Sequence, residues 1–311
     1  MKKLSALLIS AFSALLLCLP ASAEETEDFL YAVKSDGTAV ITEFIGYETD
    51  IVIPAQLDGY EVSEIGAYCF EHEHSLRTVE IPSSVRTISE KAFSACYGLE
   101  SVKLSEGLEE IKDYAFSECS YLREITIPDS VTSLGQSAFL NCSYLYKAVI
   151  GDGVKVISES AFKDCYVLEE LSLGENVTEI EKSAFESARI PTIYIPLSVQ
   201  RIHNYAFDET GIRNVYYAGT EKQWESIGIS YGNSDLEYAD IRYMVDAEGK
   251  TDPAVLRKTV GVIVIYAGVV AAIIVVVIVV ISRTRKKDEC PYCNSHIDED
   301  SEYCGNCGSK L

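Results

Sequence analysis

Two consecutive stretches of the chain have the same length and the same order of residue types: LEEIKDYAFSECSYLREITIPDS (108–130) and VTSLGQSAFLNCSYLYKAVIGDG (131–153). Each contains the dipeptide Ala-Phe at the same place. The dipeptide recurs at Phe93, Phe116, Phe139, Phe162, Phe185 and Phe207, so successive phenylalanines are 23, 23, 23, 23 and 22 residues apart. Cys69-Phe70 is a seventh copy, 23 residues before Phe93. A fixed period of this length is typical of repeat architectures and predicts a stack of similar coils.

Other apolar residues recur at fixed distances from each Phe. Ile or Leu stands five residues before it, and Val or Leu three residues earlier still, as Ile111 and Leu108 do for Phe116. About six residues after the Phe comes Leu or Ile, followed by stretches such as LREITI (122–127) in which apolar residues alternate. This alternation predicts a strand with one buried face. Pro, Gly, Asn, Asp and Ser then predict a tight turn.

One such unit cannot bury its apolar positions alone. Stacked units can, because equivalent residues form continuous rows along the axis. With strands about 4.8 Å apart, about seven coils of 22–23 residues make a face about 29 Å long. We therefore expect residues 48–217 to form a β-rich solenoid, preceded by a cap segment at 24–47.

The repeat unit I-P-x-S-V-x-x-I-x-x-x-A-F-x-x-C-x-x-L resembles the BspA-like leucine-rich repeat, also called the Treponema pallidum type. Residues 53–70 are similar to the longer opening repeat of that family, and residues 216–243 to the segment that closes its arrays. The closing segment predicts a C-terminal cap at 218–245, where Thr220 and Gln223 fit a capping box for a short helix carrying Trp224. The resemblance implies a right-handed leucine-rich-repeat solenoid and a surface role in adhesion or recognition. It does not imply an enzyme.

Both ends of the chain carry targeting features. Residues 1–23 combine two lysines, an apolar stretch and an A-x-A cleavage motif, which predicts a secretory signal peptide. After a linker at 246–258, residues 259–282 are 24 uncharged and mostly apolar residues, about 36 Å as a helix and enough to cross a bilayer. The basic segment 283–289 predicts that the C-terminal side is cytoplasmic. We expect a single-pass plasma-membrane protein whose N-terminal part lies outside.

The last segment, residues 290–311, carries two Cys-x-x-Cys pairs separated by ten residues. Four thiolates match a closed tetrahedral zinc site, and a segment this short needs metal to supply its folding energy. It resembles the short zinc ribbons at the ends of many bacterial membrane proteins. We expect one structural zinc ion, with iron or a redox-active dithiol as alternatives, held by Cys290, Cys293, Cys304 and Cys307.

The charge is unevenly distributed. Residues 24–258 carry 19 Lys and Arg against 42 Asp and Glu, a net charge of −23, whereas the tail 283–311 is close to neutral. So acidic an ectodomain argues against nucleic acid and anionic lipid as partners. It fits a solvated surface or a basic partner.

Four cysteines stand three residues after a repeat Phe: Cys96, Cys119, Cys142 and Cys165. Disulfides are the ordinary expectation in an exported domain. The repeat favours buried thiols instead, because neighbouring Cβ atoms in such a row are about 4.8 Å apart and a disulfide needs about 3.8 Å. The stretch EHEH (71–74) is a weak metal motif in a polar loop. Without a nucleophile elbow, a P-loop or a dinucleotide fingerprint, the sequence predicts no enzyme.

The outward positions of the predicted strands form the candidate ligand face. The chain has 20 tyrosines, and exposed Tyr offers a large amphipathic contact area. Other tyrosines are expected to cover turns, and Tyr121 and Tyr144 occupy equivalent turn positions. The residues predicted to contact a ligand are Lys103, Arg123, Tyr146, Lys147, Glu169, Glu170, Tyr194, Arg213 and Tyr216.

Two functions follow from these features. The first is a cell-surface protein that binds an extracellular protein or glycan, with an adhesin as its simplest form. The second is a transmembrane sensor that couples an outside binding event to a cytosolic protein partner of the zinc ribbon. If the ribbon only stabilises the tail, the first function remains. The sequence leaves the oligomeric state and the ligand open.

Overall fold

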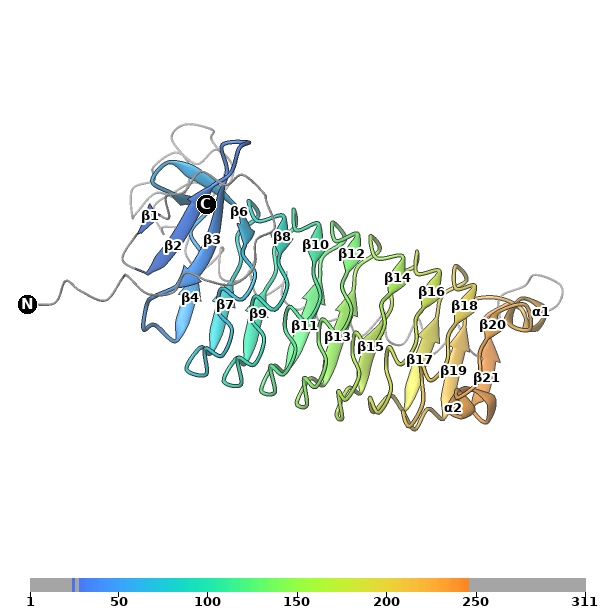
Figure 1. Cartoon of the computed structure of the whole chain (residues 1–311). Helices are drawn as coiled ribbons and strands as arrows, with labels where there is room; N and C mark the ends of the chain where they lie inside the picture. Colours follow the sequence, from blue (N-terminus) through green and yellow to red (C-terminus); the bar gives the residue numbers. More distant parts are fainter. Residues whose placement is uncertain (1–23, 26–27, 246–311) are drawn as a thin grey trace, which may run out of the picture. The chain divides into compact units, whose positions relative to one another are not determined.

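The computed structural model describes residues 24–25 and 28–245 (Figure 1). The predicted signal peptide (1–23), linker (246–258), membrane span (259–282), basic segment (283–289) and zinc ribbon (290–311) lie outside the described residues. Within the described ranges, no helix is long and apolar enough to span a bilayer.

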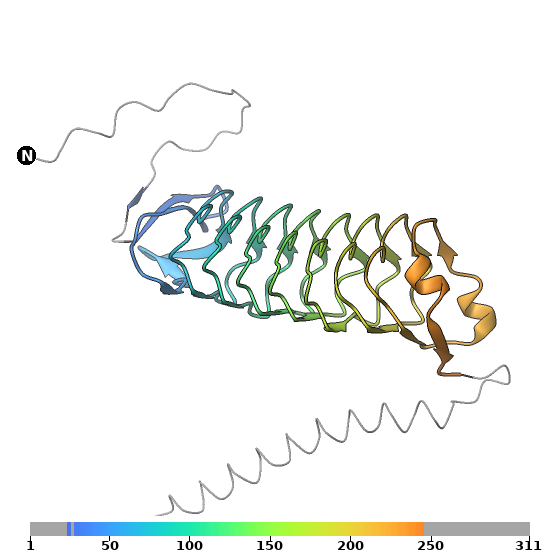
Figure 2. The same cartoon turned by 90° about the horizontal axis from the view of Figure 1, so that it is seen from below.

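The predicted strands form a column of parallel strands, one from each coil. Register is kept at the repeat spacing, so that Glu124 pairs with Lys147 and Lys147 with Glu170. Figures 1 and 2 show these strands side by side in chain order. The first six form one sheet: β4 (Asp50–Val52), β7 (Thr78–Glu80), β9 (Ser101–Lys103), β11 (Glu124–Ile127), β13 (Lys147–Ile150) and β15 (Glu170–Ser172). Three more continue it: β17 (Thr192–Ile195), β19 (Asn214–Tyr217) and β21 (Asp240–Tyr243).

The column divides between β15 and β17 at a proline. In the other coils, the residue before the strand donates its backbone N–H to the preceding coil, as Glu169 does to Tyr146 O at 3.0 Å. Pro191 occupies this position in the sixth coil. Because proline has no N–H, the bond to Glu169 cannot form, and the ladder is interrupted there.

A second column of shorter strands runs along another side of the coils. It begins with the six-residue strand β6 (Tyr60–Ile65), against which β5 (Gln56–Leu57) pairs. Two-residue strands follow: β8 (Thr87–Ile88), β10 (Glu110–Ile111), β12 (Ser133–Leu134), β14 (Val156–Ile157), β16 (Glu179–Ile180), β18 (Arg201–Ile202) and β20 (Gly228–Ile229). Each of these strands except β20 contributes one inward Ile or Leu at the position five residues before the repeat Phe.

The third side of each coil is the turn around the repeat Phe, and here the backbone is left-handed at two places. The residues two before and two after each Phe have φ between +53° and +65°, and none of them is glycine. In the first six coils, these two residues and the Phe donate their N–H groups to the next coil at 2.7–3.1 Å, as Phe93 does to Ala115 O. The residues between them donate within their own turn, as Ser94 does to Lys91 O. Apart from the Ala138 N–H, these backbone donors of the six turns are paired, which offsets the cost of the left-handed conformation.

The predicted core rows are confirmed. The phenylalanines from Phe70 to Phe207 are fully buried, and neighbouring rings stack with centroids 4.7–5.5 Å apart and planes within 12°. The inward Val, Ile and Leu residues of the strands complete the core around this row.

The prediction of buried thiols is also confirmed. The cysteines in the described part of the chain are free and buried. The thiol of Cys142 donates to Phe116 O at 3.2 Å, and the other three cysteines of the row donate in the same way to Phe70, Phe93 and Phe139. Burial raises the pKa of Cys96 to about 12, so these groups remain neutral thiols.

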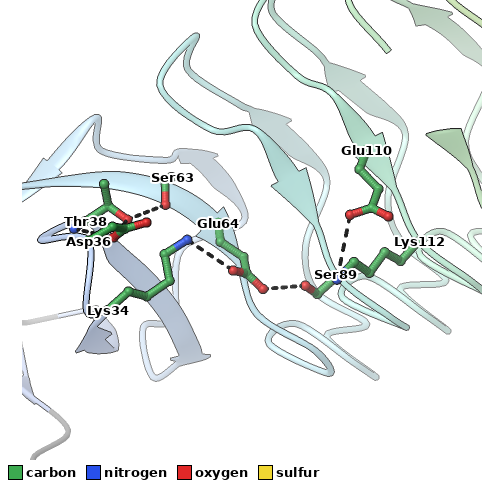
Figure 3. A network of polar contacts seen from close by, with 8 residues as sticks. All are labelled: Lys34, Asp36, Thr38, Ser63, Glu64, Ser89, Glu110 and Lys112. Atoms are coloured by element: carbon green, nitrogen blue, oxygen red, sulfur yellow. Dashed lines mark hydrogen bonds and ion pairs between the residues drawn. The ribbon is translucent and has the colours of Figure 1, made fainter. Parts of the chain in front are cut away.

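The N-terminal end is covered by β1 (Glu24–Glu25), β2 (Phe29–Val33) and β3 (Ala39–Phe44). β2 is antiparallel to both β1 and β3, and β3 pairs in parallel with β6. Polar contacts join this cap to the first coils (Figure 3). Glu64 is the centre, since it accepts from Lys34 Nζ at 3.4 Å and from Ser89 Oγ at 2.7 Å. Thr38 Oγ1 is 2.8 Å from Ser63 Oγ. The cap is thus tied to two successive coils.

The C-terminal end is covered by two short helices, α1 (Glu221–Trp224) and α2 (Ser234–Glu237). The predicted capping box of Thr220 and Gln223 is present on α1, and Trp224 is buried against Tyr217. Asn233 closes the last turn. Its Oδ1 accepts the Phe207 N–H at 2.9 Å, and its Nδ2 donates to the carbonyls of His203 and Ser230. The Asn233 side chain thus takes the place of the backbone carbonyl that a further repeat turn would offer to Phe207.

Candidate binding surface

The predicted ligand residues lie together on one surface, which we call the strand face: the exposed positions on and just before the strands of the first column. Arg123, Tyr146, Glu169 and Arg213 each stand directly before a strand, and Lys147 and Glu170 open β13 and β15. Lys103, Tyr194 and Tyr216 are outward residues further along β9, β17 and β19. The structure therefore brings all nine residues to one side of the solenoid.

Charges on the strand face are paired between coils. Glu100 lies 2.5 Å from Arg77 and 3.7 Å from Arg123, and Lys103 is paired with Glu80. Lys147 is 3.7 Å from Glu170, and Glu169 is 3.3 Å from Arg189. Such exposed pairs add little stability. Their consequence is electrostatic, because the strand face keeps little net charge on an otherwise acidic domain.

Two tyrosines at the C-terminal end of the strand face are held in place by polar partners. The Tyr194 hydroxyl donates to Glu175 at 3.5 Å, and burial, together with the Glu175 charge, raises the pKa of Tyr194 to about 12. The Arg242 guanidinium lies 5.6 Å from the centre of the Tyr216 ring and donates to the Tyr216 hydroxyl at 3.2 Å. These rings are ordered contact surfaces, which lowers the entropy lost on binding.

A second group of aromatic side chains forms a surface that the sequence prediction did not identify. Tyr97, Tyr121, Tyr144 and Tyr166 lie on four consecutive coils in the turn before the strands, and they are 40–58% exposed. We call them the turn ridge. Tyr121 and Tyr144 were recognisable as equivalent positions. Tyr97 and Tyr166 stand four rather than five residues after the repeat Phe of their coils. An alignment of the repeats therefore puts them in a different column from Tyr121 and Tyr144.

The EHEH stretch begins the same row. His74 stacks on Tyr97 with ring centroids 4.8 Å apart, and its Nδ1 lies 3.1 Å from Ala95 O. Across residues 28–245, no group of three or more His, Cys, Asp and Glu side chains could hold a metal ion. The predicted zinc ligands Cys290, Cys293, Cys304 and Cys307 lie outside the described residues.

Comparison with known proteins adds the following. Residues 49–169 and 143–242 match a family model described as the BspA type leucine rich repeat region, in six copies. No curated protein gives a significant match. A crystal structure of a T. pallidum leucine rich repeat protein is similar at 25% identity, covering 68% of this chain and 86% of that chain, with a TM-score of 0.48.

Two further solved structures are similar. One is a leucine-rich repeat protein from Bacteroides capillosus (33% identity, 41% of this chain, 96% of that chain, TM-score 0.37). The other is a leucine rich cell surface protein from Faecalibacterium prausnitzii (20% identity, 67% of this chain, 98% of that chain, TM-score 0.34). Since these TM-scores are below 0.5, the assignment depends on the matched repeat model, which spans more than half of the 311 residues.

Proposed function

Because this chain belongs to the BspA type leucine rich repeat family, we propose that it is a cell-surface recognition protein whose strand face binds an extracellular protein or glycan. Leucine-rich repeat solenoids generally serve protein binding and are typically scaffolds rather than enzymes. One observation supports the choice of face: the nine predicted residues lie on a single surface, with Tyr194 and Tyr216 already held by their own partners.

The chemistry of the strand face favours a ligand recognised by contact area and hydrogen bonds. Its ion pairs leave little net charge to attract a ligand over a distance. Tyrosine rings supply apolar area and hydroxyl groups together, a combination that is enriched in recognition surfaces. Saturable binding that survives moderate salt is therefore the expected behaviour.

The location is part of the same proposal. A signal peptide at 1–23 and a membrane span at 259–282 place the solenoid outside the cell and residues 290–311 in the cytoplasm. There Cys290, Cys293, Cys304 and Cys307 hold one structural zinc ion, since reduced thiolates are available in that compartment and four of them complete a tetrahedral shell. Full-length protein should contain one zinc per chain, and a variant with all four cysteines replaced by Ser should contain none.

The test measures binding of full-length protein to a panel of matrix glycoproteins and glycans at several salt concentrations. The variant Tyr194→Ser/Tyr216→Thr takes its replacements from Ser172 and Thr126, the outward residues that β15 and β11 carry at the equivalent position. Tyr238→Ser, at a site 87% exposed near the end of the C-terminal cap, is the matched control. If the double variant loses binding while Tyr238→Ser binds like the wild type, the strand face is supported as the binding surface. Equal binding by the wild type and both variants contradicts it.

The second candidate function, a transmembrane sensor, is favoured by the cysteine pairs of the tail, because an adhesin needs only an anchor. Deleting residues 288–311 distinguishes the two functions. Unchanged surface binding with loss of a cytosolic response supports the sensor. Unchanged surface binding with no change in the cytosolic response supports adhesion.

A further inference from the structure

The turn ridge is a second exposed aromatic surface, separate from the strand face. Four Tyr rings on consecutive coils extend over three strand spacings, about 14 Å. Exposed aromatic side chains gathered on one side of consecutive coils are a feature of interaction sites. An extended polypeptide advances about 3.3 Å per residue, so four or five residues of a partner match the length of the ridge.

The rings of the turn ridge form blocks. Tyr121 and Tyr144 are stacked with centroids 5.3 Å apart and planes at 8°, and His74 and Tyr97 form a second stack. In the described part of the chain, neither stack makes a ring contact with the other or with Tyr166. Outer ring faces are therefore not covered by other rings, and a Tyr face attracts cations.

Among the described residues, the carboxylates beside the ridge have no cation partner, whereas most of those on the strand face do. Glu118 accepts a hydrogen bond from the Tyr97 hydroxyl at 3.2 Å. Burial, and secondly the charge of Asp164, raise the pKa of Tyr166. Glu73 is the residue directly before His74 in the chain. Within residues 28–245, none of these three carboxylates forms an ion pair. The nearby cations are already engaged, since Lys163 lies 2.8 Å from Glu186 and Arg189 lies 3.3 Å from Glu169.

We propose that the turn ridge docks a Lys- and Arg-rich polypeptide segment of another protein. Arginine suits both halves of this surface, because its guanidinium stacks on Tyr rings and also binds carboxylates in a bidentate manner. The partner's cations supply the charges that Glu73, Glu118 and Asp164 lack. On the strand face, by contrast, Glu80, Glu100, Glu169 and Glu170 are each paired with a Lys or Arg. This inference does not depend on the function of the strand face.

The experiment uses full-length protein and a fluorescein-labelled nine-residue peptide of alternating Arg and Ser, with alternating Glu and Ser as the control peptide. The ridge variant Tyr97→Ser/Tyr121→Ser/Tyr144→Val/Tyr166→Ser uses residues that other coils have at the same positions: Ser120, Ser75, Val167 and Ser143. It therefore keeps the net charge of the chain. The strand-face variant Tyr194→Ser/Tyr216→Thr is the matched control, and circular dichroism checks the fold of both.

Fluorescence anisotropy should show that the ridge variant binds the arginine peptide at least about tenfold more weakly, or about 1.4 kcal/mol, while the strand-face variant stays within about twofold of the wild type. Glu118→Gln/Asp164→Asn should weaken binding and also reduce its dependence on salt. If the ridge variant binds within twofold of the wild type, the peptide is held by the diffuse negative charge and the proposal is wrong. It is also wrong if the peptide does not bind, or if only a neutral oligosaccharide binds in a ridge-dependent manner.

Discussion

Replacing Phe139 by Ala tests how much the stacked phenylalanine row contributes to stability. The Phe139 ring is fully buried and lies between Phe116 and Phe162, with centroids 5.3 and 5.1 Å away. Truncation of a buried Phe costs about 3–5 kcal/mol. Because two ring pairs are lost at once, each contributing about 0.5–1.5 kcal/mol, the expected loss lies in the upper half of that range, about 4–5 kcal/mol.

Urea unfolding measures this loss with two signals. Far-ultraviolet circular dichroism follows the whole array, and fluorescence follows Trp224, the one Trp of the chain, which is buried in the C-terminal cap. At an m-value of about 3 kcal/mol/M, a loss of 4 kcal/mol lowers the urea midpoint by about 1.3 M. If the coils unfold cooperatively, both signals shift together. If they unfold separately, the Trp224 midpoint shifts less, because coils of a solenoid contact only their neighbours.

Tyr144→Ala is the matched control for stacking without burial. Tyr144 also loses a stacked partner, Tyr121, but it is 58% exposed, so the expected cost is only about 0.5–1.5 kcal/mol. A similar loss in both variants would refute the reasoning. It would mean that the coils close around the missing Phe ring and that burial of this row does not set the stability.

Three further outcomes are expected. Asn233→Ala should cost about 2–4 kcal/mol in urea unfolding, first in the Trp224 signal, because the Phe207 N–H and two carbonyls lose their partner; a cost below 1 kcal/mol would mean that water replaces the side chain. The hydrogen bond from Arg201 holds the pKa of Glu179 below its usual value of 4.5, so its contribution is present above that pH and is lost as the pH falls through the lower folded pKa. Glu179→Gln should therefore flatten the acid side of the stability curve, and an unchanged acid side would contradict this. Mass spectrometry after thiol labelling should find Cys69, Cys96, Cys119, Cys142 and Cys165 protected in native protein and modified after denaturation, whereas protection that persists in denaturant would indicate disulfides.

The sequence predicted the parts of the fold that the repeat period controls. The Phe row, the strands after it and the thiol row of Cys96 to Cys165 follow from positions that recur every 23 residues, and each is confirmed. The left-handed turn residues were not predicted. They include Lys91, Tyr114 and Ser137 rather than glycine, so no residue preference marks them. Their conformation is imposed by the hydrogen bonds between coils.

The candidate binding surfaces were predicted less completely. The alternation of the strands placed five of the nine candidate residues on one face, and the other four stand directly before the strands: Arg123, Tyr146, Glu169 and Arg213. The pairing of their charges could have been recognised from the period, because Glu80 and Lys103, like Lys147 and Glu170, are 23 residues apart. The turn ridge was missed because Tyr97 and Tyr121 differ by one residue in register. Side chains from neighbouring turn positions reach the same surface, and this depends on side-chain direction rather than on spacing.

The turns around the repeat phenylalanines and the strands of the first column are hydrogen-bonded in opposite directions along the axis. In the turns, N–H groups donate toward the C-terminal cap, as Phe93 does to Ala115 O, whereas residues before the strands donate toward the N-terminal cap, as Glu169 does to Tyr146 O. The C-terminal cap must therefore offer an acceptor on the turn side and donors on the strand side. It offers both: Asn233 Oδ1 accepts the Phe207 N–H, while the backbone N–H groups of Gly228 and Asp240 donate back to the last coil. A coil inserted into the array preserves this pattern, whereas the two caps cannot be exchanged, because the N-terminal end requires the reverse arrangement.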